Sequence, residues 1–257
     1  MALFNSKSGN PAMSEKIFDK SLQQYNVSEG TMTVNGSIGK FGFLLLMVIG
    51  GAFYTWSLYY RGEFSLMQTM MFAGIFGGLV TAIAITINQK LAKYLAPLYG
   101  ILEGFFLGSI SAFFNDAFAQ KAPGIVPQAV GLTFAVGLAM LALYRFGVIK
   151  VTDRLRSVII SATLGIALFY LVTWILSLFH VNVGFMYNSS LLGIGISLFV
   201  VVIAAMNLLL DFDMIYRGSQ LGAPKYMEWY GAFGLLITMV WLYLEILRLL
   251  SRVYGRK

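Results

Sequence analysis

Four acidic residues lie within or at the ends of long apolar stretches of this chain: Glu103, Asp211, Asp213 and Glu245. A carboxylate surrounded by hydrocarbon is costly unless it is paired, neutralised or hydrated. For that reason, ionisable residues inside apolar spans mark ion pathways and proton relays in membrane proteins. The sequence therefore points first to proton or cation chemistry.

Asp211 and Asp213 end one of the longest apolar runs, in the segment LLLDFDMIYRGSQ. In a helix their side chains point about 200° apart, so only one can face the protein interior. We expect Asp211 to be buried, and Asp213 to lie at the membrane boundary, paired with Arg217 at i,i+4. The face of Asp211 carries small or polar residues that suit helix packing: Asn207, Ala204, Val200, Ser197 and Gly193.

Glu245 and Glu103 extend the set of candidates for a proton-sensing ion pathway. Glu245 shares a helical face with Thr238, and we expect it to pair with Arg248 at i,i+3. Glu103 shares a face with small residues, and by depth it could meet Asp211 near one membrane boundary. Two carboxylates in a poorly hydrated site bind protons or a hard cation competitively. The candidate pathway contains Asp211, Glu245, Glu103, Asp213, Thr238 and Asn207, with Asp211 and Glu103 as tentative Ca²⁺ ligands.

The scarcity of Cys and His in the chain excludes several kinds of catalytic and metal-binding sites. The chain has no Cys and a single His, His180, which excludes thiol catalysis, disulfides and the usual zinc and iron–sulfur sites. No nucleophile, metalloprotease or phosphate-loop motif is present. We expect no enzymatic activity, and no cofactor apart from Ca²⁺ as a bound or transported ion.

The residues around these carboxylates predict an all-α, polytopic integral membrane protein. The chain is 58% hydrophobic and 11% charged over 257 residues, which leaves too little polar surface for a soluble domain. The apolar runs lack the period-two alternation of β-barrel strands. Seven of them are long enough to cross a bilayer as helices, forming a seven-helix bundle: residues 39–60, 65–87, 95–114, 126–145, 157–179, 189–211 and 229–250.

The flanking segments predict the organisation and orientation of the chain. We expect a polar cytoplasmic tail over 1–38, the transmembrane domain over 39–252 and a basic tail over 253–257. With the N-terminus in the cytoplasm, most of the 18 Lys and Arg residues fall on the inner side, although the basic C-terminal tail does not. The net charge of +7 is then explained by basic loops and tails that face the anionic membrane surface. We expect the lipid bilayer as the partner, and no binding of nucleic acid.

Two GxxxG motifs predict close helix packing in the bundle. Gly74 and Gly78 form one, and Gly104 and Gly108 form the other. Small residues at this spacing let two helix backbones approach closely. We expect them to serve packing rather than ligand binding.

Several motifs together resemble the Bax inhibitor 1 family, in particular its bacterial branch within the transmembrane Bax inhibitor motif proteins. They are DFDMI near the end of the sixth span, WLYLEILRLL in the seventh, APLYGILEGFFLGSIS in the third, and KAPGIVPQAV and GAPKYMEWYGAFGLL before the fourth and seventh. The resemblance covers residues 40–252. It implies a seven-helix bundle and, for the bacterial branch, the plasma membrane.

The resemblance also implies a function. Better-studied family members are regarded as pH-sensitive Ca²⁺ leak channels, in which an Asp of the sixth helix shares a hydrogen bond with one of the seventh. Asp211 matches the first of these positions, and either Glu245 or Thr238 matches the second. We therefore expect a passive Ca²⁺ leak gated by protons. The alternative is a non-transporting scaffold that binds other membrane proteins in proteolysis or stress responses.

Overall fold

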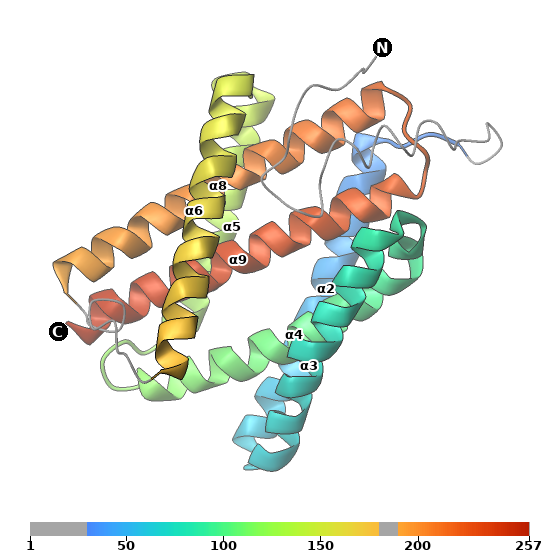
Figure 1. The fold of residues 1–257 in the computed structure, drawn as a ribbon. Helices are drawn as coiled ribbons and strands as arrows, with labels where there is room; N and C mark the ends of the chain where they lie inside the picture. The colour runs from blue at the N-terminus through green and yellow to red at the C-terminus, as the bar shows by residue number, and fades with distance from the viewer. Residues whose placement is uncertain (1–29, 180–189, 257) are drawn as a thin grey trace. The chain divides into compact units, whose positions relative to one another are not determined.

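The computed structural model describes residues 30–179 and 190–256, which fold into helices with no strand (Figure 1). Seven of the described helices are long and apolar enough to cross a membrane, as predicted. They are α2 (Val34–Tyr60), α3 (Phe64–Ile87), α4 (Ala92–Ala117, preceded by the 3-10 turn η2, Gln89–Leu91), α5 (Ile125–Arg145), α6 (Asp153–Leu178), α8 (Leu191–Gln220) and α9 (Met227–Gly255). The chain is therefore an all-α integral membrane protein.

Several helix boundaries differ from the predicted spans by a few residues, and two of these differences bear on the charged residues. Helix α2 begins at Val34 rather than at residue 39, because the Thr33 side chain caps it by accepting a hydrogen bond from the Gly36 N–H. Helix α8 continues past Asp211 to Gln220 and ends before Gly222, whose φ of +69° stops a helix. Both aspartates therefore lie inside α8.

The described residues form two compact units, and each is considered by itself. Unit 1 contains residues 30–117 and 214–237, and unit 2 contains residues 118–179, 190–213 and 238–256. Helices α8 and α9 contribute residues to both units.

Unit 1 is organised around α4, which packs against both α2 and α3. A Cβ added to Gly104 would overlap the backbone carbonyl of Val48, and one added to Gly108 would overlap that of Ala52. A Cβ added to Gly74 of α3 would likewise overlap the backbone carbonyl of Leu102 in α4. The prediction that the GxxxG motifs permit close helix packing is confirmed for these glycines.

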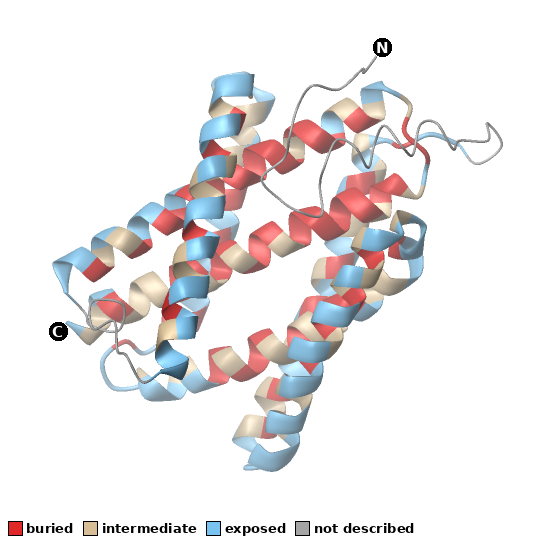
Figure 2. Cartoon of the chain, in the orientation of Figure 1, coloured by how far each residue is buried: buried red, intermediate tan, exposed pale blue. Residues whose placement is uncertain are grey.

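Unit 2 has a core where α6, α8 and α9 meet. Ile166, Val200 and Ile203 are buried together there, and Tyr170 and Trp241 pack against them. Figure 2 shows that many residues of α8 and α9 are buried, whereas α6 is mostly exposed. Many exposed side chains of α6 are large and apolar, as lipid contact requires: Val158, Leu164, Leu168, Leu171, Val172, Trp174, Ile175 and Leu178.

Candidate functional site

Asp211 is fully buried, with 0% of its surface exposed. The residues that precede it on the same face of α8 are buried as well: Asn207, Ala204, Val200, Ser197 and Gly193. This confirms the prediction that Asp211 faces the interior of the protein. The stripe was recognisable in the sequence because residues three and four apart share one side of a helix.

Asn207 connects this face of α8 to α6. Its amide nitrogen donates to Thr163 Oγ1 of α6 at 2.9 Å and to the Ile203 carbonyl of its own helix, also at 2.9 Å. An interhelical hydrogen bond thus lies one turn before Asp211. It holds α8 in a fixed rotation relative to α6, with the Asp211 face inward.

Asp213 is buried too, and the prediction that it lies at the membrane boundary, exposed to water or headgroups, was wrong. Its side chain is 9% exposed and forms an ion pair with Arg156 of α6, at 2.7 Å between Oδ2 and Nη2. The Tyr144 hydroxyl of α5 lies 3.2 Å from Oδ1. Earlier residues on the same side of α8 as Asp213 are exposed, at Phe199 and Val202. Asp213 itself, in contrast, is covered by the first turn of α6 and the last turn of α5.

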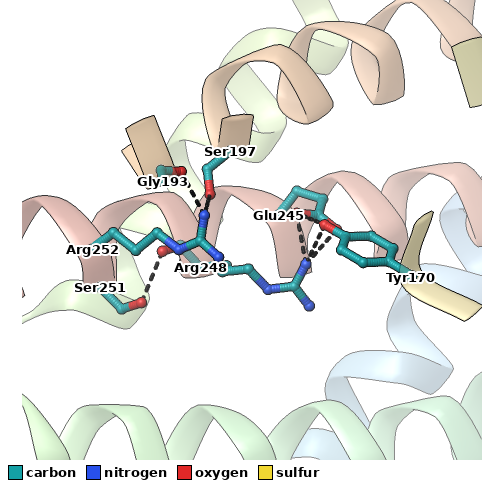
Figure 3. A network of polar contacts seen from close by, with 7 residues as sticks. All are labelled: Tyr170, Gly193, Ser197, Glu245, Arg248, Ser251 and Arg252. Atoms are coloured by element: carbon teal, nitrogen blue, oxygen red, sulfur yellow. Dashed lines mark hydrogen bonds and ion pairs between the residues drawn. The ribbon is translucent and has the colours of Figure 1, made fainter. Parts of the chain in front are cut away.

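Glu245 lies at the centre of a cluster near the C-terminal end of α9 (Figure 3). The carboxylate contacts Arg248 Nη1 at 2.8 and 2.9 Å, which confirms the predicted i,i+3 pair. The Tyr170 hydroxyl of α6 lies 3.1 and 3.2 Å from its two oxygens. Sequence reasoning missed Tyr170, because nothing in the pattern of α6 distinguishes it from an interfacial tyrosine.

Arg252 fastens the same end of α9 to the start of α8. Its Nη1 donates to the Gly193 carbonyl at 2.5 Å and to Ser197 Oγ at 2.6 Å. The residue is 9% exposed. Ser197 belongs to the small-residue stripe of Asp211, so its hydroxyl serves a buried arginine.

Glu103 lies in unit 1, where its Oε2 faces Gly78 of α3, 3.5 Å from the position of an added Cβ. Tyr99, one turn earlier in α4, is buried beside it and packs edge-on against Phe233. Asp211 belongs to unit 2, so the expected meeting of Glu103 and Asp211 stays a prediction. Thr238 is buried in unit 2, and whether it or Glu245 is the partner of Asp211 also stays open.

Glu228 is a buried carboxylate that the sequence interpretation did not select. It lies in the first turn of α9, is 0% exposed, and accepts from both Thr33 N and Thr33 Oγ1 at 2.9 Å. Lys225 Nζ lies 3.0 Å from Oε1, and Lys40 Nζ pairs with Oε2. Nothing in the sequence indicated this burial, because an acidic residue in the first turn of a helix, three residues after a lysine, is usually exposed to solvent.

The backbone before α2 completes this contact, which we call the N-terminal clasp (residues 30–40 and 222–229). The Met32 N–H donates to the Ala223 carbonyl at 2.6 Å, and the Lys225 N–H donates to the Gly30 carbonyl at 3.1 Å. Thr31 and Pro224 face each other in an antiparallel bridge. The clasp fastens the start of α2 to the start of α9 within unit 1.

The described residues contain no group of three or more His, Cys, Asp or Glu that could hold a metal ion. A resident Ca²⁺ takes six to eight oxygen ligands. Asp211 and Glu103 belong to different units, so their role as tentative Ca²⁺ ligands stays a prediction. His180 lies outside the described residues.

A comparison of the sequence with models of known protein families found a match. A family model described as Bax inhibitor 1 like matches residues 10–255. The chain belongs to the Bax inhibitor 1 like family. Comparisons with curated proteins and with solved structures found no match. In this Bax inhibitor 1 like protein, the match includes every buried charge described above, from Arg156 to Arg252.

Proposed function

We propose that this Bax inhibitor 1 like protein is a passive, pH-sensitive leak pathway for cations, with Ca²⁺ as the transported ion. The observation that carries the proposal is the complete burial of Asp211 inside a membrane-spanning helix. Burial of an ionisable group in a membrane is expensive, and such groups are retained where protons or ions use them.

The other buried charges support the same function. Asp213, Glu228 and Glu245 are each 6% exposed or less, and each has at least one basic partner. Ion pairs of this kind are bistable, because protonation of the acid removes the attraction and leaves an uncompensated base. A change in pH can therefore change helix contacts.

The direct test is Ca²⁺ flux through liposomes that contain only this purified protein. We expect a Ca²⁺ gradient to dissipate faster than in empty liposomes, with a rate that depends on pH. An equal rate in protein-containing and empty liposomes at every pH would refute the proposal. A non-transporting scaffold for other membrane proteins, the alternative function, predicts that equal rate.

The proposal includes the location and orientation. We propose the bacterial plasma membrane, with the N-terminal segment and the N-terminal clasp on the cytoplasmic side. The distribution of Lys and Arg supports this orientation, because basic segments are retained in the cytoplasm. Lys40 and Lys225, which both contact Glu228, are among those residues.

A further inference from the structure

Glu103 lies near the middle of the candidate membrane span α4. It is about 16 Å along the helix axis from Ala92, where α4 begins, and about 21 Å from Ala117, where it ends. The hydrocarbon core of a bilayer is about 30 Å thick, so a residue this far from both ends of a crossing helix lies within it. The Glu103 carboxyl group is consequently distant from the headgroups on both sides of the membrane.

Within the described residues, no Lys or Arg forms an ion pair with Glu103. The neighbouring helix α3 contains no charged residue. On α4 itself the nearest charged residue in the sequence is Lys93, about 15 Å away along the helix axis. The buried carboxylates Asp213, Glu228 and Glu245, in contrast, each have at least one basic partner. Glu103 therefore has a different charge environment from those three.

Helix α2 contributes one charged residue, Lys40, and this lysine pairs with Glu228, the one charged residue of α9 within unit 1. Helices α2 and α4 run parallel, as the contacts of the GxxxG glycines show, and Gly100 lies against Leu44. Counted from that contact, Lys40 and Glu103 are about 10 Å apart along the helix axes. Lys40 thus neutralises Glu228 at the start of α9 rather than Glu103.

The titratable group that faces the Glu103 carboxyl group is the hydroxyl of Tyr99. The two side chains are one turn apart on α4 and hydrogen-bonded. Glu103 Oε2 lies 3.5 Å, and a Tyr99 ring carbon 3.9 Å, from the position of a Cβ added to Gly78 of α3. Tyr99 is buried, and its ring packs edge-on against Phe233, with 4.9 Å between the ring centres. This packing fixes the direction in which the hydroxyl points.

An ionised Glu103 would place a charge in hydrocarbon with a neutral hydroxyl as its partner, which is unfavourable. A proton removes the charge, and the resulting acid still accepts a hydrogen bond from Tyr99. We propose that Glu103 is a proton-binding site of unit 1, a carboxylic acid that is neutral at neutral pH and is positioned by the Tyr99 hydroxyl. A divalent ion would instead leave a net positive charge beside one carboxylate. The site is separate from the proposed Ca²⁺ pathway, which rests on Asp211.

The first test uses dicyclohexylcarbodiimide, which dissolves in the bilayer and reacts with protonated carboxyl groups. The acid proton moves to a carbodiimide nitrogen while the carboxyl oxygen bonds to the central carbon, and this adduct rearranges to a stable N-acylurea. Glu103 is partly exposed, so the reagent can reach it. At neutral pH, peptide mass spectrometry of the protein in liposomes should locate the adduct on Glu103.

Two other carboxylates of the same protein are the controls for this labelling. Glu63 is exposed before α3, and Glu245 pairs with Arg248. Water and the guanidinium stabilise their charged forms, so both should stay unlabelled. Absence of an adduct on Glu103, or equal labelling of the three carboxylates, would overturn the proposal.

Competition with metal ions decides between a proton and another cation as the ligand. Labelling is repeated with excess NaCl or CaCl₂, and with choline chloride at the same ionic strength as the reference. A proton site should be labelled to the same extent in all three salts. Protection of Glu103 by Na⁺ or Ca²⁺ would identify a metal-ion site and contradict the proton assignment.

Infrared spectroscopy tests the role of Tyr99. A protonated carboxylic acid has a carbonyl stretching band that a carboxylate lacks, and this band moves to lower wavenumber when the carbonyl accepts a hydrogen bond. The difference between wild type and Glu103→Gln should contain the band at neutral pH. Tyr99→Phe keeps the ring and removes the hydroxyl, so it should move the band to higher wavenumber. A difference spectrum without the band would refute the site.

Tyr230→Phe is the matched control for Tyr99→Phe. Tyr230 is fully buried, its ring packs against the same Phe233, and its hydroxyl has no hydrogen-bond partner among the described residues. Its removal should leave the band of Glu103 in place, and an equal shift in both tyrosine variants would argue against the bond from Tyr99. Neither labelling nor infrared spectroscopy measures flux. Absence of Ca²⁺ flux would therefore overturn the proposed function and leave the proton site standing.

Discussion

The Glu228 carboxylate occupies the space in which a side chain on residue 36 would lie. A Cβ added to Gly36 would overlap Oε1, Oε2 and the carboxyl carbon of Glu228. The glycine is therefore what lets the start of α2 approach the start of α9 closely enough for Thr33 and Lys40 to bind the same carboxylate. A missing methyl group at residue 36 makes the N-terminal clasp possible.

Gly36→Ala should destabilise the protein through this contact. The added methyl group displaces the buried carboxylate from its partners, which we expect to cost at least about 2 kcal/mol in the free energy of unfolding. Reversible unfolding in mixed micelles measures the difference. Gly39→Ala is the control, because no atom lies within 4 Å of its added Cβ. There the same change should be neutral or stabilising, since alanine favours helix. Equal effects of both substitutions would contradict the role of Gly36.

Asp213→Asn should be strongly destabilising, in contrast to the small effect that exposure to water or headgroups would imply. The substitution removes the buried negative charge that Arg156 contacts, and breaking a buried pair in this way costs about 3–5 kcal/mol. Asp153→Asn tests the other carboxylate near Arg156, 3.3 Å away with an 83% exposed side chain. It should cost less than about 1 kcal/mol. Similar unfolding free energies for the two variants would argue against the Asp213–Arg156 pair.

Asp211→Asn should flatten the pH dependence of Ca²⁺ flux. The amide resembles the carboxylate in size but carries no charge at any pH within the working range, so protons no longer act at this position. The measurement is initial flux in liposomes across the acid to neutral range. Glu63→Gln, an exposed carboxylate before α3, should retain the wild-type profile. If Asp211→Asn also retains it, Asp211 is not the proton-responsive group.

The two ends of the chain should lie on opposite sides of the membrane. An odd number of spans requires this arrangement, and the described residues contain seven candidate spans. Reporter fusions at each end measure it, and we expect the N-terminal reporter in the cytoplasm and the C-terminal one outside. A cytoplasmic C-terminal reporter would show that one helix does not cross or that the orientation is reversed.

Local periodicity explains what sequence reasoning predicted correctly. Helical runs of sufficient length located the spans, because hydrocarbon thickness sets the number of residues that a crossing helix needs. The burial of Asp211 and the Glu245–Arg248 pair followed from residues three and four apart, whose side chains meet on any helix. These features depend on one helix at a time.

The sequence by itself determined the membrane class, the spans and the inward face of α8. The tertiary structure decided which distant residue meets each charge: Arg156 for Asp213, Tyr170 for Glu245, and Thr33 with Lys40 for Glu228. These partners are 57, 75, 195 and 188 residues apart along the chain. A single helix sets the direction of a side chain, but only the packing of a second helix places a partner opposite it. Burial of Glu228 and Asp213 could therefore not be predicted from their own segments.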